Sequence, residues 1–283
     1  MKKRSALFCG RLLIFLLLVA LAWGCAGFGL PGRPPAVPEV HPGYLRGYIA
    51  FDKAPDSLVL LGPPPAAGSA AAALDEEVFQ ARQALRNTPR WSLAVDDANL
   101  KFPAAADAFS CALDLPISER ETPYLYQILR RSMTDAIVAT LKAKNRYQRI
   151  RPFVAHATTT CSPDWEEELR KDGSYPSGHS AIGWTWALIL SELDPAHGDA
   201  LVVRGRAFGE SRVICNCHWQ SDVLEGRFIG SAVFSRLHAS PGFVSDMKAA
   251  RAEMTAARAR SLKPDRNCVA EKAALLIAPP AER

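Results

Sequence analysis

The chain of 283 residues is 48% hydrophobic and 22% charged, which is ordinary for a globular protein. This composition excludes a disordered chain, a collagen-like repeat and a membrane protein with many spans. The net charge is +5, but four of the 34 basic residues lie in the first 24 residues, which carry no acid. The remaining 30 basic and 29 acidic residues nearly cancel, so no nucleic-acid polymer is expected as a partner.

The N-terminus has the layout of a secretory signal peptide. Three basic residues at positions 2–4 precede an apolar stretch from Leu12 to Trp23 that is too short to span a bilayer. Residues 1–24 are therefore predicted to direct export to the periplasm. Two outcomes remain open: cleavage after the small residues 20 and 22 releases a soluble protein, whereas Ala22-Trp23-Gly24-Cys25 resembles a lipobox and would anchor Cys25 to the membrane.

Seven cysteines in an exported chain raise the question of disulfides, because the compartment is oxidising. Cys9 leaves with the signal peptide. Lipidation of Cys25 leaves five cysteines, at least one of them unpaired, whereas retention of a free Cys25 gives six. The sequence does not fix their pairing.

The region after the signal peptide divides into a proline-rich segment and a helical body. Nine prolines fall between residues 31 and 66, which predicts an extended strap over residues 25–66. Residues 67–283 show helical periodicity and no alternating strand pattern, so we predict an all-α fold, a single-domain helical bundle.

Apolar spacing and capping residues predict five helices in this body. The first is capped by Ser69 and has Leu74, Val78, Ala81 and Leu85 on its buried face. The second starts at Thr122-Pro123 and buries Leu125, Leu129, Met133, Ala136 and Leu141. The others span Ser180 to Leu193, Val223 to Leu237 and Phe243 to Arg260. The helix from Ser180 to Leu193 is predicted to be the central one, because it is largely apolar.

A first cluster of chemically active residues runs from Lys144 to Arg151-Pro152 and is unusually cationic. A solvated helix end would explain such a run in isolation. Alternatively, Lys144 and Arg151 converge on an anion, because a guanidinium holds two phosphate oxygens and an ammonium adds a point charge.

A second cluster, Pro176-Ser177-Gly178-His179, lies where a loop enters the apolar central helix. A helix start presents unpaired backbone N–H groups, and Gly178 lets an anion approach the backbone closely. Ser177 and Gly178 are therefore candidates for binding phosphate, with His179 beside them. An N-cap serine, a turn glycine and an incidental histidine would be the alternative.

A third cluster contains Ser211-Arg212, His218 and Asp222. On a helical turn the Asp222 carboxylate would accept the Nδ1 proton of His218 and leave Nε2 free as a base or nucleophile. Arg212 adds a third cation. A metal site built from His179, His218 and Asp222 is disfavoured, because the neighbouring cations would repel zinc and attract phosphate.

Together the three clusters resemble the signature of the acid phosphatase superfamily that includes type 2 phosphatidic acid phosphatases and vanadium haloperoxidases. The stretches Gly173 to His179 and Gly209 to Cys215 are similar to those of bacterial class A non-specific acid phosphatases, and the likeness covers roughly residues 44–260. The resemblance implies an all-helical fold, and it implies hydrolysis of nucleotides, sugar phosphates and aryl phosphates without a metal or other cofactor.

The resemblance also implies a role for each site residue. His218 would attack phosphorus, oriented by Asp222, and His179 would protonate the leaving oxygen. Lys144, Arg151, Arg212, Ser177 and Gly178 would hold the phosphoryl oxygens. The optimum is expected to be acidic, with His179 protonated and His218 free. Cys217 adjoins the nucleophile, so its oxidation would shift the site.

Three other functions are weighed against this one. A lipid phosphatase of the same superfamily would carry several membrane spans, and none follows the signal peptide. A vanadium haloperoxidase is typically a much longer chain and would oxidise bromide. A non-enzymatic phosphate-binding protein would need no His218–Asp222 pair. The preferred leaving group and assembly into a homo-oligomer stay open.

Overall fold

The computed structural model describes residues 32–279. The predicted signal peptide and the predicted lipidation site Cys25 lie outside the described residues. In chain order the elements are β1 (Glu39–His41), β2 (Tyr44–Leu45), η1 (Phe51–Lys53), α2 (Ser57–Leu60), α3 (Ala70–Arg82), η2 (Gln83–Leu85), α4 (Pro89–Asp97), α5 (Ala104–Asp107), α6 (Ser110–Leu113), α7 (Pro123–Tyr147), α8 (Pro152–Ala155), η3 (Pro163–Trp165), α9 (Glu166–Lys171), α10 (Gly178–Leu193), η4 (Pro195–His197), α11 (Gly198–Ile214), α12 (Gln220–Leu237), α13 (Pro241–Ala259) and α14 (Cys268–Leu275).

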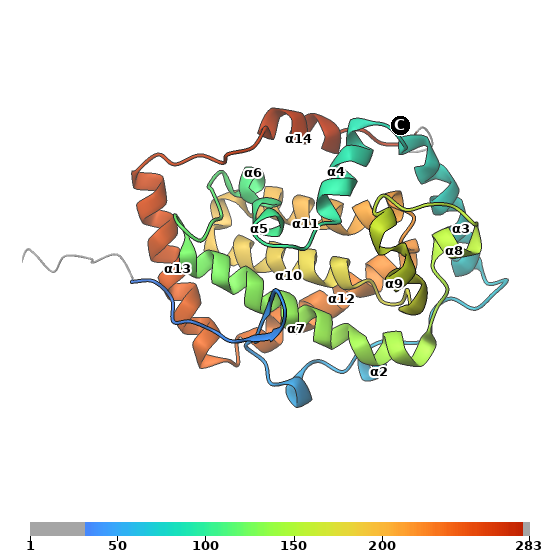
Figure 1. Ribbon diagram of the computed structural model, residues 1–283, viewed down its shortest axis with the longest axis horizontal. Helices are drawn as coiled ribbons and strands as arrows, with labels where there is room; N and C mark the ends of the chain where they lie inside the picture. The colour runs from blue at the N-terminus through green and yellow to red at the C-terminus, as the bar shows by residue number, and fades with distance from the viewer. Residues whose placement is uncertain (1–31, 280–283) are drawn as a thin grey trace, which may run out of the picture. The chain divides into compact units, whose positions relative to one another are not determined.

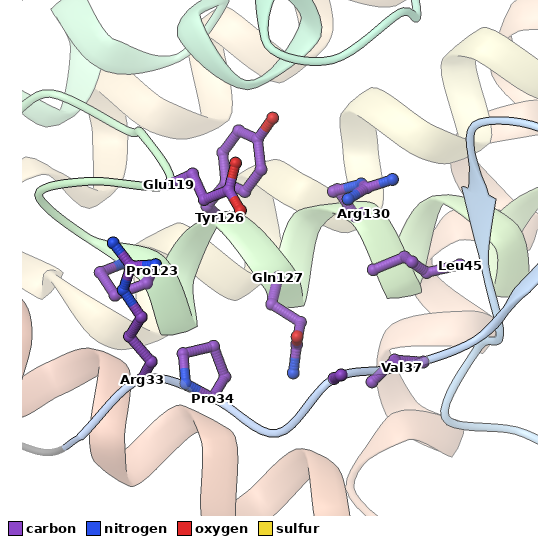
Figure 2. Close-up of a pocket in the computed structure, with 10 residues that line it drawn as sticks. Arg33, Pro34, Val37, Leu45, Glu119, Pro123, Tyr126, Gln127 and Arg130 are labelled. Atoms are coloured by element: carbon purple, nitrogen blue, oxygen red, sulfur yellow. The ribbon is translucent and has the colours of Figure 1, made fainter.

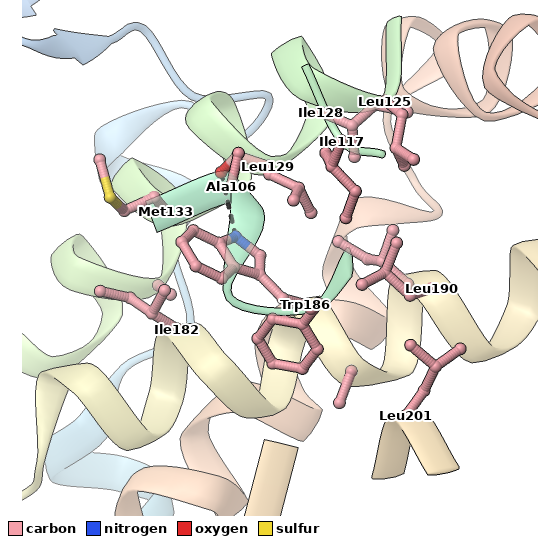
Figure 3. Close-up of a cluster of buried hydrophobic side chains, with 14 of the residues drawn as sticks. Ala106, Ile117, Leu125, Ile128, Leu129, Met133, Ile182, Trp186, Leu190 and Leu201 are labelled. Atoms are coloured by element: carbon pink, nitrogen blue, oxygen red, sulfur yellow. Dashed lines mark hydrogen bonds between the residues drawn. The ribbon is translucent and has the colours of Figure 1, made fainter. Parts of the chain in front are cut away.

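Helix α10 is the centre of the fold and packs against α7, α11 and α12 (Figure 1). Its Trp186 is fully buried, and the indole Nε1 donates a hydrogen bond of 3.0 Å to the carbonyl of Leu129 on α7 (Figure 3). Because the indole N–H is satisfied, the large ring adds apolar area to the core without an unpaired donor. The predicted all-α class is confirmed, and among residues 32–279 the only sheet is the short antiparallel pair β1–β2.

The proline-rich strap is fastened to α7. Asp135 of α7 accepts hydrogen bonds from the backbone N–H groups of Tyr48 at 2.9 Å and Ile49 at 3.0 Å. A Cβ atom at Gly47 would collide with the Asp135 carboxylate, so the close approach requires glycine. Figure 2 shows the strap running beside the first turns of α7, with a pocket between them. The strap is thus held by specific bonds, and it is not extended throughout as predicted, because it includes the short helices η1 and α2.

The helix starts predicted at Ser69 and Thr122-Pro123 agree with the structure, the other three begin two or three residues earlier than predicted, and one predicted core position is wrong. The Oγ atom of Ser69 caps α3 by accepting from Ala72 N at 3.2 Å, and α7 begins at Pro123. On α3, however, Leu74 is 54% exposed, whereas Asp75 and Phe79 are buried. The spacing of apolar residues predicted that Leu74 is buried, because this pattern assigns every polar residue, including Asp75, to the exposed face of the helix.

Helices α4, α11 and α14 had no clear counterpart in the sequence pattern. Helix α11 carries glycines and a buried arginine instead of a simple apolar stripe. A Cβ atom at its Gly205 would collide with Ala187 of α10, so the small residue permits the close packing of the two helices. Arg204 is buried beside it and pairs with Asp97 of α4.

Two disulfides link distant parts of the chain. Cys111 bonds Cys268, and Cys161 bonds Cys215. Cys217 is the only free cysteine among the described residues, and it is buried. No helix within residues 32–279 is both long enough and apolar enough to cross a membrane.

Candidate active site

The last turn of α7 and the segment that follows supply two buried cations. Lys144 is 6% exposed and Arg151, which precedes α8, is 2% exposed. Their Nζ and Nη2 atoms lie 2.9 Å and 2.8 Å from the same oxygen, Oδ2 of Asp172. Burial and the neighbouring Arg151 lower the pKa of Lys144 to about 8. The two cations therefore converge on one point, and a carboxylate lies there.

The loop before α10 brings the helix start to these cations. Gly173 lies against α7, where a Cβ atom would come within 2.6 Å of the Lys144 carbonyl. Ser177 is the N-cap of α10, and its Oγ accepts from Ser180 N at 3.3 Å. The first-turn N–H groups of Gly178 and His179 have no acceptor within the helix. The N-terminus of α10 therefore faces the Lys144 side chain. A Cβ atom added at Gly178 would lie 4.0 Å from Cε of Lys144.

The four-residue spacing suggested that His218 and Asp222 lie on the same helix. In the structure His218 instead lies just before the helix that contains Asp222. Helix α12 starts at Gln220, and Asp222 in its first turn accepts the N–H of Trp219 at 2.8 Å. His218 Nδ1 is 3.5 Å from Asp222 Oδ2 and 3.4 Å from the hydroxyl of Ser174. His218 and Asp222 are therefore close together, with His218 before the start of α12 and Asp222 in its first turn.

The tautomer of His218 follows from its neighbours. Its Nε2 atom is 3.1 Å from Nη1 of Arg151, a group that can only donate. Nε2 must then be unprotonated and Nδ1 must carry the proton toward Asp222. Burial, followed by the charges of Arg151, Lys144 and Arg212, lowers the pKa of His218 well below its ordinary value. A neutral imidazole is the form needed by a nucleophile, and its Nε2 lone pair, which accepts from Arg151 in the structure, becomes free to attack when that N–H turns to a phosphoryl oxygen.

Arg212 of α11 is buried at 2% exposure. Its Nε and Nη1 atoms have no hydrogen-bond partner among the described residues. A buried guanidinium without acceptors is costly, because it has lost its hydration without compensation. Its location beside two further cations makes an anion the natural missing partner.

His179 lies in the first turn of α10. Its Nε2 is 3.2 Å from the carbonyl of Ala98, which can only accept, so Nε2 carries a proton. The ring is stacked over Phe208 of α11. Burial, followed by the charge of Arg212, lowers the pKa of His179 well below its ordinary value. The neutral form of this histidine is therefore favoured.

Four contributing residues were not assigned from the sequence. Asp172 pairs with the two cations, and Ser174 donates from its hydroxyl to Asp222 Oδ2. Arg149 donates to Asp222 Oδ1 at 2.6 Å and to Asp75 Oδ2 of α3 at 2.7 Å. Ser174 and Arg149 stand inside the recognised motifs, whereas nothing in the local sequence marks Asp75.

The eight residues predicted for the site meet in one place, at the ends of α7, α10 and α11 and the start of α12. Within residues 32–279, no three His, Cys, Asp or Glu side chains are arranged so that they could hold a metal ion. Cys217 is next to His218, but its sulfur contacts the Cys215 carbonyl at 3.5 Å. The site is thus a buried cluster of cations with two neutral histidines, suited to a tetrahedral anion.

Comparisons with known proteins agree with this chemistry. Residues 124–243 match the family model of the PAP2 superfamily. The chain is 42% identical to a non-specific acid phosphatase of Providencia stuartii, over 73% of this chain and 84% of that protein. It is 40% identical to a non-specific acid phosphatase of Salmonella typhimurium, over 74% and 84% of the two chains. An acid phosphatase of Zymomonas mobilis is 35% identical, over 89% and 94%.

Proposed function

Since this chain belongs to the bacterial class A non-specific acid phosphatases of the PAP2 superfamily and is therefore an acid phosphatase, we propose how its site carries out the reaction and on which substrates. The proposed reaction is metal-independent hydrolysis of phosphate monoesters of broad type, through a phosphohistidine. The observation that carries it is the group of three buried cations, Lys144, Arg151 and Arg212, around the unprotonated Nε2 of His218.

In the first step, His218 Nε2 attacks phosphorus and the bond from phosphorus to the leaving oxygen breaks. The leaving oxygen takes a proton from His179 and departs as an alcohol. In the second step, water gives a proton back to His179 and attacks phosphorus, and the bond to His218 breaks to release phosphate. Asp222 keeps the Nδ1 proton of His218 in place throughout, which directs Nε2 at the substrate.

The three cations stabilise the charge on the phosphoryl oxygens as it redistributes in each transition state. They would replace the metal ion that many phosphatases use, so activity should survive treatment with EDTA. These groups contact the phosphoryl group alone, which supports tolerance of nucleotide, sugar and aryl leaving groups. A phosphate-release assay across those three classes tests the breadth.

Substitution His218→Ala tests the mechanism directly. We expect loss of turnover of p-nitrophenyl phosphate by at least about 10³-fold and loss of the acid-labile phosphoenzyme, because no neighbouring nitrogen replaces Nε2. The matched control is His238→Ala, which removes a surface histidine paired with Glu192. A variant lacking His218 that still forms an acid-labile phosphoenzyme would refute the assignment.

We also propose that the enzyme is exported to the periplasm. The signal-peptide pattern supports this, and two disulfides in the described residues are typical of an oxidising compartment. Mass spectrometry of the mature N-terminus distinguishes cleavage after residue 22 from lipidation at Cys25. Recovery of intact protein only from the cytosol would contradict export.

A further inference from the structure

The Asp172 carboxylate lies over Lys144 and Arg151, the cations proposed to bind phosphate. Asp172 follows the last residue of α9 and its side chain is 48% exposed, whereas the side chains of Lys144 and Arg151 are 7% and 2% exposed. A single carboxylate oxygen accepts from both cations. An exposed anion thus covers two cations that are themselves buried.

The donor groups of Arg151 are fully used in this arrangement. Its Nε donates to the carbonyls of Leu169 and Asp172, and its Nη1 contacts the Cys217 carbonyl and His218 Nε2. Its Nη2 contacts Asp172 Oδ2 at 2.8 Å and the Gly173 carbonyl at 3.4 Å. A guanidinium has five N–H groups. A phosphoryl oxygen can therefore bind Arg151 only by displacing an acceptor that is already there.

Asp172 is the acceptor that can leave most easily. The backbone carbonyl partners of Arg151 are fixed by the fold, and the buried His218 keeps its Nε2 on Arg151 until it attacks phosphorus. Asp172 belongs to a short segment, because α9 has six residues and none of them is buried. Rotation of one short side chain would return its carboxylate to water at little cost.

We propose that Asp172 is an internal competitor for the phosphate site, an affinity-determining residue that a substrate must displace from Lys144 and Arg151. This inference rests on the proposed function, in which those two cations bind the phosphoryl group. A phosphoryl group offers several oxygens to the two cations, whereas Asp172 offers one, so phosphate displaces the carboxylate. The same competition helps to expel the product, inorganic phosphate.

The test compares Asp172→Asn and Asp172→Ala with Glu167→Gln. Glu167 is on the same helix, is 80% exposed and pairs only with Lys171 among the described contacts, so its variant removes the same charge away from the site. Inorganic phosphate is the probe, its affinity measured by calorimetry and as a competitive inhibitor of p-nitrophenyl phosphate turnover. Binding is measured near pH 6 and again near pH 5, below the Lys144 pKa of about 8 in the wild type, because Asp172 is one of the groups that raise this pKa and its removal lowers it.

Both Asp172 variants should bind phosphate about five- to tenfold more tightly than the wild type and show a KM lowered by a similar factor. Glu167→Gln should match the wild type. Thermal unfolding confirms that each variant is folded, and the alanine variant serves if the asparagine variant is not. Unchanged or weaker phosphate binding in the folded variants would overturn the proposal. Failure of the proposed function would appear differently, as a wild-type enzyme that neither binds phosphate nor releases it from substrate.

Discussion

At the scale of single residues, the two histidines require a revision of the expected pH dependence. The acidic optimum expected from the sequence requires a protonated His179 and a free nitrogen on His218. In the structure, burial and the cations lower the pKa of both histidines well below 6.5. His179 therefore needs a nearby negative charge to become a general acid, and the bound phosphoryl group supplies it.

This coupling predicts that a bound dianion brings a proton with it. Binding raises the pKa of His179, so affinity should increase as pH falls below about 6.5, by up to about tenfold per pH unit. Sulfate is a suitable probe because it stays a dianion in this range, whereas phosphate changes its own charge. The measurement is the inhibition constant of sulfate between about pH 4.5 and pH 7.

The slope should vanish in His179→Ala. It should persist in Asp172→Asn, because that variant keeps His179. The variant therefore distinguishes proton uptake by His179 from protonation of the Asp172 carboxylate that competes with the anion. A sulfate affinity that is independent of pH in the wild type would show that His179 is already protonated, or that it does not face the anion.

The residues that could be predicted for the site are those held by the local chain. Ser177 and Gly178 mark a helix start, and His218 with Asp222 marks a close pair, because each relation spans a few residues. Arg149 reaches Asp75 across 74 positions of sequence. That contact depends on where α3 docks, and a buried carboxylate on α3 conflicts with the apolar pattern that sequence analysis relies on.

At the scale of elements, two buried carboxylates fasten backbone segments to the bundle. Asp135 of α7 holds the strap, and Glu253 of α13 accepts the N–H groups of Tyr124 and Leu125 at the start of α7. Glu253 thus caps α7 from another helix, where Thr122 makes no side-chain cap bond. A capping residue in the sequence predicted where α7 begins, but not which side chain satisfies its first N–H groups.

These carboxylates predict a contribution to stability that is present in mild acid and lost as pH rises. Burial raises the pKa of Asp135 from 3.8 to about 6 and that of Glu253 from 4.5 to about 7. At these two groups the folded protein binds more protons than the unfolded chain, so their contribution to the free energy of unfolding falls as pH rises from about 4.5 to about 7, whereas the lowered pKa values of the two buried histidines act in the opposite direction. We expect the two carboxylates to account for a loss on the order of 2 kcal/mol, measured by urea unfolding of the wild type and the variants at several pH values.

Substitutions Asp135→Asn and Glu253→Gln should each flatten this dependence, because they remove a titrating group and keep an oxygen acceptor. The exposed pair of Lys142 and Asp56 offers a control, since Asp56→Asn removes a surface carboxylate that bonds the Lys142 ammonium. A pH dependence of stability that is the same in the wild type and in both variants would contradict the assignment of raised pKa values.

At the scale of the whole molecule, the disulfides divide into one that stabilises the fold and one that also supports the site. The Cys111–Cys268 bond joins α6 to α14 across 157 positions, far from His218 in the chain. The Cys161–Cys215 bond spans 54 positions and fixes the end of α11. Cys215 is three residues before His218, and the intervening Asn216 has a positive φ of 59°. The second bond therefore restrains the turn that presents the nucleophile.

The prediction compares the paired variants Cys111→Ser/Cys268→Ser and Cys161→Ser/Cys215→Ser. The loop lengths give upper values of about 5 and about 4 kcal/mol for the stabilisation by each bond, so both variants should unfold at lower temperature, the first at least as much as the second. Turnover of p-nitrophenyl phosphate well below the unfolding temperature should show the opposite order. It should stay near the wild-type value when Cys111–Cys268 is removed and fall severalfold in kcat when Cys161–Cys215 is removed, because His218 loses its fixed position relative to Arg151 and Asp222. Equal activity in the two folded variants would show that α11 and α12 hold the turn without the bond.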